Sequence, residues 1–303
     1  MEEEVSRDSQ WNKGEHADLK EITILSGKGG TGKTTFTASF AVLADNAVIA
    51  DCDVDAPDLH MLLHPAPVQN QQFDGPELAE INPERCIKCG LCQEACRFEA
   101  IMDFRVDPIL CEGCGTCAVV CPEDAVSLKP RISGEAFISK TRYGTMAHAL
   151  LFPGGSNSGK LVTLVRQNAK EAALKEKSEM VLIDGPPGIG CPAIASITGV
   201  DIGVIVTEPT VSGIHDMKRV LQLLAHFNVR PLVCINKSDL NEQNTRKIDR
   251  FCKKQQINVI GKVPFDPIVT KAMVFEKPIV EYSPESVVSQ EIRDMWKDLL
   301  SGI

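Results

Sequence analysis

The amino-acid sequence predicts an α/β protein with a doubly wound, mostly parallel β-sheet and a small α+β domain inserted into it. Two observations predict the larger part: apolar runs of strand length alternate with helix-like runs, and the connections between them are short. The insertion is predicted by an abrupt change of composition, because eight of the twelve cysteines fall between Cys86 and Cys121. We therefore expect one domain over 21–81 and 131–303, and an inserted domain over 82–130.

Composition limits the classes of function. No apolar run approaches the ~20 residues that a membrane-spanning helix needs, so the sequence predicts no stable membrane insertion. The net charge of -9 argues against sequence-independent binding to nucleic acid, which requires clustered Lys and Arg. Residues 1–20 are acidic and lack an apolar stretch, so we expect a disordered extension that is no export signal, and a cytoplasmic location.

The first strand-like run, Ile22–Leu25, leads into a glycine-rich loop and then into a helix-like run, Phe36–Leu43. A strand, a glycine loop ending in GK[ST] and a helix form the context of a phosphate-binding loop, which predicts an ATP site. Glycine lets backbone N–H groups close on phosphate oxygens, and the helix N-terminus adds positive potential. Lys33 is expected at the β- and γ-phosphates and Thr34 on Mg²⁺. The expected nucleotide-binding residues of the loop are Gly27, Lys28, Gly29, Gly30, Thr31, Gly32, Lys33, Thr34 and Thr35.

Lys28 separates this loop from an ordinary phosphate loop. With it the motif reads KGGTGKT, which resembles the deviant Walker A pattern KGGxGK[ST] of the MinD, ParA, Mrp and nitrogenase-iron-protein class of ATPases, the SIMIBI class. The resemblance implies a homodimer that forms on ATP binding. In it, Lys28 reaches the partner's phosphates and joins Lys33 in catalysis, where a cation neutralises charge that develops during transfer. A solvated loop lysine is the alternative for Lys28.

The run Ala47–Asp51 is predicted to be a short buried strand that ends in the acidic segment DCDVDAPD. Acidic residues at the carboxyl end of a strand beside a phosphate loop lie where α/β folds place their chemistry. The family resemblance implies that this segment is the first switch and that Asp53 orients or activates the attacking water. Asp55 and Asp58 are weaker candidates, for which helix capping is the alternative.

Residues 64–81 are rich in Pro, Gln and Asn without a clear period, so we predict a linker. Two runs with the spacing C-x2-C-x2-C-x3-C follow. This is the spacing of bacterial two-cluster ferredoxins, in which the fourth cysteine of each run ligates the other cluster. One 4Fe–4S cluster is therefore expected on Cys86, Cys89, Cys92 and Cys121, and the other on Cys96, Cys111, Cys114 and Cys117. Zinc is the alternative for CxxC pairs, but three cysteines at successive x2 steps oversupply a four-ligand zinc site.

After the cysteines the α/β pattern returns. Strands are predicted over Ala136–Lys140 and Ala147–Phe152, followed by a turn over 153–160 and a helix to about Lys175. The run MVLID, which ends at Asp184, is a buried strand followed by GPPG. In the family that the chain resembles, this is the Walker B strand and second switch, so Asp184 would hold Mg²⁺ through water and the Gly188 N–H would sense the γ-phosphate. A structural aspartate at a strand end is the alternative.

Three further predicted strands complete the sheet, Ile202–Thr207, Leu232–Ile235 and Val259–Val263, with helices over 212–226 and 242–255 between them. The resemblance implies that Asn236 and the backbone near Pro264 read the adenine, and a helix cap is the alternative for Asn236. The last helix, over 284–300, places apolar side chains on one face and mixed charges on the other. Because membrane surfaces attract basic faces, we expect this helix to pack on the core.

Together the motifs resemble those of MinD- and Mrp-type P-loop ATPases with an inserted two-cluster ferredoxin domain. Two classes of function remain. In one, Mg²⁺-dependent ATP hydrolysis gates electron transfer from the clusters to a redox partner; in the other, the protein is an iron–sulfur carrier or a MinD-like positioning ATPase whose clusters are structural or sensory. Cys191 lies where the nitrogenase iron protein carries a ligand of its bridging cluster. Because no cysteine stands near Asn157, where the second ligand would be, we expect no bridging cluster.

Overall fold

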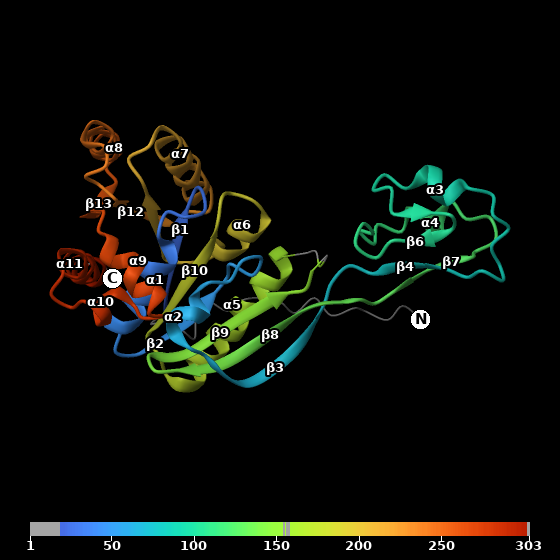
Figure 1. Cartoon of the computed structure of the whole chain (residues 1–303), viewed down its shortest axis with the longest axis horizontal. Coiled ribbons are helices and arrows are strands. Elements are labelled where there is room, and N and C mark those ends of the chain that lie inside the picture. The colour runs from blue at the N-terminus through green and yellow to red at the C-terminus, as the bar shows by residue number, and fades with distance from the viewer. Residues whose placement is uncertain (1–18, 154, 156–157, 302–303) are drawn as a thin grey trace, which may run out of the picture.

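The computed structural model describes residues 19–153, 155 and 158–301, and a nine-stranded sheet lies at its centre (Figure 1). The strand order is β13-β12-β11-β1-β10-β2-β9-β8-β3, and all neighbours from β13 to β9 are parallel. The strands are β1 (Lys20–Ser26), β2 (Ala47–Asp51), β3 (Ala66–Asp74), β8 (Ile132–Thr141), β9 (Gly144–Leu151), β10 (Met180–Pro187), β11 (Ile202–Thr207), β12 (Arg230–Asn236) and β13 (Asn258–Val263). The predicted α/β fold with a mostly parallel sheet is confirmed.

Helices cover both faces of this sheet. They are α1 (Lys33–Leu43), α2 (Leu59–Leu63), α5 (Ser158–Glu176), α6 (Cys191–Ile197), α7 (Val211–His226), α8 (Glu242–Lys254), α9 (Pro267–Val274), α10 (Ile279–Tyr282) and α11 (Val287–Ser301). Along β1, Ile24 packs into the core that contains α1 and α11, whereas Leu25 packs into the core that contains α5 and α7. Burial on both faces explains why the strands read as near-continuous apolar runs.

The last helix, α11, packs into the core as predicted. Its buried residues include Val288, Ile292, Met295, Trp296 and Leu299. The ring of Trp296 lies 5.3 Å from that of Phe40, measured between centroids. Among the described residues, no helix combines the length and the apolar character that crossing a membrane requires.

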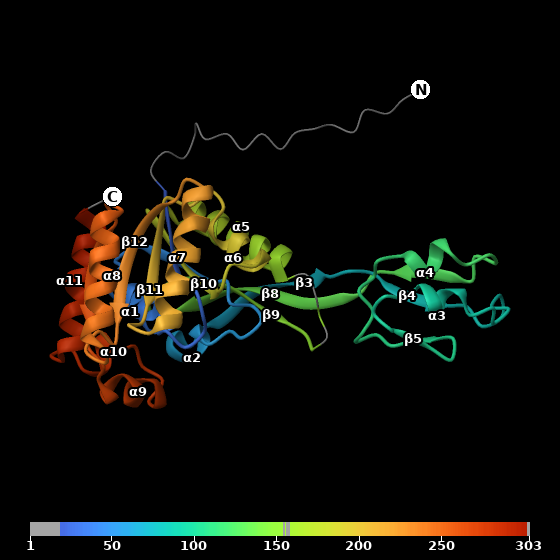
Figure 2. The same cartoon turned by 90° about the horizontal axis from the view of Figure 1, so that it is seen from above.

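The cysteine-rich segment forms a small lobe of its own, which lies at the far end of β3 and β8 from the body of the sheet (Figures 1 and 2). Its elements are β4 (Leu78–Ile81), α3 (Leu91–Ala95), β5 (Ile101–Met102), β6 (Arg105–Val106), α4 (Thr116–Val119) and β7 (Val126–Lys129). Strand β4 pairs with β7 and β5 pairs with β6, both antiparallel. The lobe therefore begins at Leu78, before the expected boundary at residue 82.

The two halves of the lobe repeat each other at an offset of 25 residues, as Cys86 and Cys111 do. Helices α3 and α4 each follow a glycine in the left-handed conformation, Gly90 with φ 85 and Gly115 with φ 76. That conformation favours glycine because it has no Cβ. The strand that opens each half pairs with the strand that follows a cysteine run, which encloses a small core between the halves.

The predicted linker over 64–81 is wrong. Residues Ala66–Asp74 form the edge strand β3, which pairs antiparallel with β8. Within β3, Phe73 is buried and the other residues are exposed, so the strand shows no alternation of apolar and polar residues. Hydrogen bonds to a distant segment determine its structure, and local pattern does not reveal them. The extension predicted over 1–20 lies, apart from Leu19 and Lys20, outside the described residues.

Candidate functional site

The phosphate loop joins β1 to α1 at the carboxyl edge of the parallel strands. Gly30 and Gly32 have φ of 77 and 99, in the left-handed region that favours glycine. A Cβ at Gly32 would also lie 2.6 Å from Nδ2 of Asn236, whereas one at Gly29 or Gly30 would meet nothing within 4 Å. The loop thus keeps open space on the side of Gly29 and Gly30, which is what a phosphate group needs.

Two side chains at the start of α1 reach the strand ends. Lys33 is 6% exposed and its Nζ lies 3.9 Å from Oδ2 of Asp53. The Thr34 hydroxyl donates to Oδ2 of Asp184 over 2.8 Å. Thr37, one turn further along α1, donates to Oδ1 of the same aspartate over 3.0 Å. The expected pair of magnesium-binding residues, Thr34 at the start of α1 and Asp184 on β10, therefore lies together.

Three buried or half-buried carboxyl groups meet here. Burial is the largest cause that raises the pKa of Asp51 well above its ordinary value, and it also raises the pKa of Asp184. Burial raises the pKa of Asp53 to about 6, against the opposing effect of Lys33. Within the described residues, Oδ2 of Asp51 and Oγ1 of Thr31 are buried without a hydrogen-bond partner. The buried Asp184 carboxylate and the Thr34 hydroxyl beside it suit Mg²⁺, which proteins usually hold through one or two oxygen ligands besides water.

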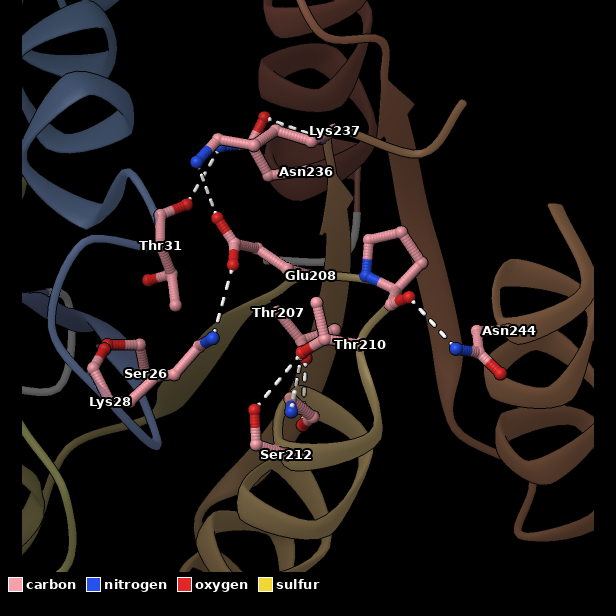
Figure 3. A network of polar contacts seen from close by, with 12 residues as sticks. Ser26, Lys28, Thr31, Thr207, Glu208, Thr210, Ser212, Asn236, Lys237 and Asn244 are labelled. Carbon is pink, nitrogen blue, oxygen red and sulfur yellow. Dashed lines mark hydrogen bonds and ion pairs between the residues drawn. The ribbon is translucent and has the colours of Figure 1, made fainter. Parts of the chain in front are cut away.

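A second polar network holds Lys28 (Figure 3). Its Nζ lies 3.3 Å from one carboxylate oxygen of Glu208, and Nζ of Lys237 lies 2.6 Å from the other. Burial alone would raise the pKa of Glu208, but the hydrogen bonds and charges of the two lysines outweigh it and lower the pKa. Lys28 is therefore paired within its own subunit in this structure.

Asn236 contacts the phosphate loop instead of capping a helix. Its Nδ2 donates to the backbone oxygen of Thr31 over 2.8 Å. The residue that caps α8 is Asn241, whose side chain accepts from the Asn244 N–H, so the capping alternative for Asn236 is wrong. Pro264 follows β13, which pairs with β12 beside Asn236.

Three other residues belong to the two expected switches, Gly188, Asp58 and Asp55. The Gly188 N–H donates to the backbone oxygen of Ser26 over 2.9 Å, so it would have to leave this bond to reach a phosphate. Asp58 stands at the N-cap position of α2 without a side-chain cap, and Asp55 is exposed. Helix capping is thus not what Asp58 does here.

The eight cysteines of the lobe line two cavities, four in each. Cys86, Cys89, Cys92 and Cys121 line one. Cys96, Cys111, Cys114 and Cys117 line the other. The two sets are those that the sequence pattern predicts for two clusters. We call the first the outer site and the second the inner site, because the inner site's loop at Gly113 packs against Glu77, where the chain enters the lobe.

Backbone hydrogen bonds reach one sulfur in each site. The Ala100 N–H donates to Sγ of Cys96 over 3.4 Å, and the Ala125 N–H donates to Sγ of Cys121 over 3.3 Å. In the part of the chain that the structure describes, no three His, Cys, Asp or Glu side chains converge closely enough to hold a single metal ion. A 4Fe–4S cluster makes a different demand, since four cysteines share four irons.

The model of the CobQ/CobB/MinD/ParA nucleotide-binding domain family matches residues 22–279. The chain belongs to this family. The expected class of P-loop ATPases is thereby confirmed, whereas the inserted ferredoxin domain stays a prediction.

Similar proteins include one whose function is not characterized and several that are named MinD. The uncharacterized protein MJ0578 of Methanocaldococcus jannaschii is 35% identical over 284 residues, which are 93% of this chain and 96% of that protein. The septum site-determining protein MinD of Bacillus subtilis is 24% identical over 92% of this chain and 88% of its own length. The structure of MinD complexed with Mg-ADP from Pyrococcus horikoshii is similar with a TM-score of 0.60 and 20% identity, covering 94% of this chain and 98% of that one. The structural likeness shows a shared fold.

Sequence reasoning missed several residues of this nucleotide-binding domain. Thr37 stands one helical turn after Lys33, a spacing that places it on the same face of α1. Glu208 directly follows β11 and Lys237 directly follows β12, so both lie at the carboxyl ends of parallel strands, where open α/β sheets bind their ligands. Cys191, at the start of α6, is exposed and belongs to neither cysteine site, and Asn157 lies outside the described residues.

Proposed function

We propose that this protein is a Mg²⁺-dependent ATPase that dimerises on binding ATP and carries two 4Fe–4S clusters on its inserted lobe. The observation that carries the ATPase part is the meeting of Lys33, Thr34 and Asp184 at the carboxyl edge of the sheet. Its relatives that are named MinD, one of them solved with Mg-ADP, support a nucleotide switch.

The chain's own residues fit a nucleotide and its magnesium. The loop from Gly27 to Thr35 would hold the phosphates with its N–H groups, and Lys33 would neutralise their charge. Thr34 and Asp184 would hold Mg²⁺, which would neutralise charge on the phosphates. Asn236, which already contacts the phosphate loop, and the backbone near Pro264 would contact the base.

Asp53 would orient the attacking water. It lies within reach of Lys33, at 3.9 Å, on the segment that follows β2. A carboxyl group whose pKa is about 6 is poised to accept a proton near neutral pH. Movement of this segment after hydrolysis would report the nucleotide state to the rest of the chain.

The cysteine sets support two 4Fe–4S clusters. Each cavity offers four thiols and one N–H···S hydrogen bond, and the two cavities repeat one arrangement. A bound 4Fe–4S cluster supplies one-electron redox chemistry. The cysteines would hold the clusters, and the small core of the lobe would limit their contact with water.

Of the two classes of function, the relatives named MinD support a positioning, carrier or sensing switch. Electron transfer gated by ATP is the second candidate, and the specific observation in its favour is that the lobe offers two complete cysteine sites, whereas one would suffice as a structural staple. The two differ in coupling. If ATP gates electrons, oxidised and reduced protein must bind ATP with different affinity, because coupling free energies are reciprocal.

The test of the ATPase uses three proteins. The unaltered chain should dimerise with ATP in sedimentation velocity and hydrolyse it. Lys28→Ala should bind ATP without dimerising or turning over, because its cation no longer reaches the partner. Asp53→Ala should dimerise without turnover, because only water activation is lost. Normal turnover by Lys28→Ala would overturn the cross-dimer arrangement.

The test of the lobe is separate from that of the ATPase. After anaerobic reconstitution we expect about eight irons per chain, four for each cluster. ATP affinity is then titrated with dithionite-reduced and with oxidised protein. One zinc per cysteine run would overturn the iron–sulfur lobe, and equal ATP affinities would favour the positioning, carrier or sensing class.

A further inference from the structure

We infer that Thr116 makes the two clusters of the lobe unequal, giving the inner site the higher reduction potential. The inference rests on the proposed iron–sulfur function. It comes from the internal repeat: each residue of one half has a counterpart 25 positions away, as Cys89 has in Cys114. Features that the halves share cannot separate the clusters, and features that they do not share can.

Backbone hydrogen bonds are shared by the two sites, and burial is shared by three of their four cysteine pairs. Cys92 of the outer site is 7% exposed and its counterpart Cys117 of the inner site is 8% exposed. Cys89 and Cys114 are both exposed. The N–H···S bonds to Cys96 and Cys121 are also counterparts, at 3.4 and 3.3 Å. Cys111 of the inner site, 9% exposed, is more buried than its half-buried counterpart Cys86, whereas the backbone donors leave the two sites alike.

The charges beside the sites are matched as well. One glutamate lines each cavity, Glu123 at the outer site and Glu112 at the inner site. One exposed cation stands in the loop of each, Lys88 between two outer cysteines and Arg97 directly after Cys96. Each site therefore has one acidic residue in its lining and one cation in its loop, and the variants tested below leave these charges unchanged.

Thr116 is a hydrogen-bond partner of a ligand sulfur that the halves do not share. Its Oγ1 lies 3.4 Å from Sγ of Cys114, within hydrogen-bond distance for sulfur, and its rotatable hydroxyl can donate to a thiolate. Its counterpart in the outer site is Leu91, which has no polar side-chain atom. Both residues are the first of a short helix that follows a left-handed glycine, so they occupy equivalent positions beside equivalent sulfurs and offer different groups.

A donor to a ligand sulfur favours the more negative form of a cluster, because hydrogen bonds to the sulfurs are among the determinants of its potential. A reductant such as dithionite is oxidised as it reduces the clusters. The first electron that it donates should reduce the cluster at the inner site. An electron that enters at the outer site should pass to the inner one, which oxidises the outer cluster and reduces the inner. The inner site packs against Glu77, next to β3 and the ATPase body.

The experiment is a redox titration of the full chain, reconstituted anaerobically, followed by electron paramagnetic resonance. Thr116→Val removes the hydroxyl at nearly constant volume, and Thr116→Ser keeps it. We expect two one-electron midpoints, of which Thr116→Val lowers only the higher one. A tenfold loss in the equilibrium constant for reduction is expected, which equals about 59 mV for a one-electron couple. Thr116→Ser should leave both midpoints in place.

Leu91→Thr provides the reciprocal arm and should raise only the lower midpoint. If Thr116→Val holds about eight irons per chain and shifts neither midpoint, or shifts the lower one, the inference is wrong. If Thr116→Val fails to bind iron, the Leu91→Thr result decides, and an unchanged lower midpoint overturns the inference. An unaltered chain that binds no iron would overturn the proposed lobe itself, a result that the iron content shows before any titration.

Discussion

Glu208 should disfavour formation of the ATP-dependent dimer, because its ion pair keeps Lys28 within its own subunit. Its side chain is 12% exposed, and it accepts from Lys28 at 3.3 Å and from Lys237 at 2.6 Å. If Lys28 crosses to the partner's phosphates, the first of these contacts must break in both subunits. Glu208→Gln keeps the size of the side chain and removes the charge that holds Lys28, so it should favour dimerisation.

The magnitude follows from the exposure of the pair. Lys28 is 35% exposed, so the contact is worth far less than its Coulomb energy in a dry interior, and about 1 kcal/mol is a fair value for a pair of this kind. Two such contacts break per dimer, which makes about 2 kcal/mol. Since ~1.4 kcal/mol is tenfold, the dissociation constant of the ATP-bound dimer should fall about 30-fold.

The assay is sedimentation velocity at saturating ATP. Every protein also carries Asp53→Ala, so that ATP hydrolysis does not dissociate the dimer during the run. The matched control is Glu242→Gln, which makes the same change of charge at an exposed residue of α8 that pairs with Arg246. ATP affinity of each monomer is measured separately, because Glu208→Gln also frees Lys237. A dimer that is unchanged or weaker in Glu208→Gln, with normal ATP affinity, would refute the reasoning.

Three further outcomes are expected. Thr37→Val leaves Oδ1 of Asp184 without its hydroxyl donor in a buried place, so the free energy of unfolding should fall by about 1–3 kcal/mol in urea titrations, and an unchanged value would contradict this. Burial lowers the pKa of His148 to about 4 in the folded protein, whereas its pKa in the unfolded chain is ~6.5. As pH falls below ~6.5, His148 therefore takes up a proton in the unfolded chain before it does so in the folded protein, which should lower the free energy of unfolding by up to about 2 kcal/mol by pH 5. The free energy of unfolding of His148→Gln should fall less over this range than that of the unaltered chain. Cys191→Ser should leave the iron content unchanged, and a loss of iron would indicate a third, bridging cluster.

The parts of the fold that could be predicted are those that the sequence encodes locally. Parallel strands buried on both faces leave apolar runs such as Ile202–Thr207, which the structure places with the same bounds. The phosphate loop has a fixed spacing, and so do the cysteine runs, whose pairing into two sites follows from spacing alone. Strand β3 has no such signal, because its exposed residues are held by backbone bonds to β8.

The contacts that could not be predicted join residues far apart in the chain. Asn236 and Thr31 are separated by 205 residues and Lys28 lies on a different strand–loop unit from Glu208. They meet because parallel strands bring their carboxyl ends to one edge, where β1, β11 and β12 are neighbours. The motif places each residue at that edge. Which side chains touch there depends on strand order, which a single sequence does not contain.

The strand order also bears on how nucleotide state and lobe can act on each other. Strand β2 ends beside Asp53 and pairs with β9, which pairs with β8, which in turn pairs with β3. Leu151, at the end of β9, donates from its N–H to the backbone oxygen of Val54, in the segment that carries Asp53. Strands β3 and β8 connect the lobe to the rest of the sheet (Figure 2). Hydrogen-bonded strands resist internal deformation, so a shift of the segment around Asp53 would reach the lobe as a rigid displacement of the whole ribbon. Both electron gating and sensing could use such a displacement, since it would move the lobe relative to a partner bound at the nucleotide-binding domain.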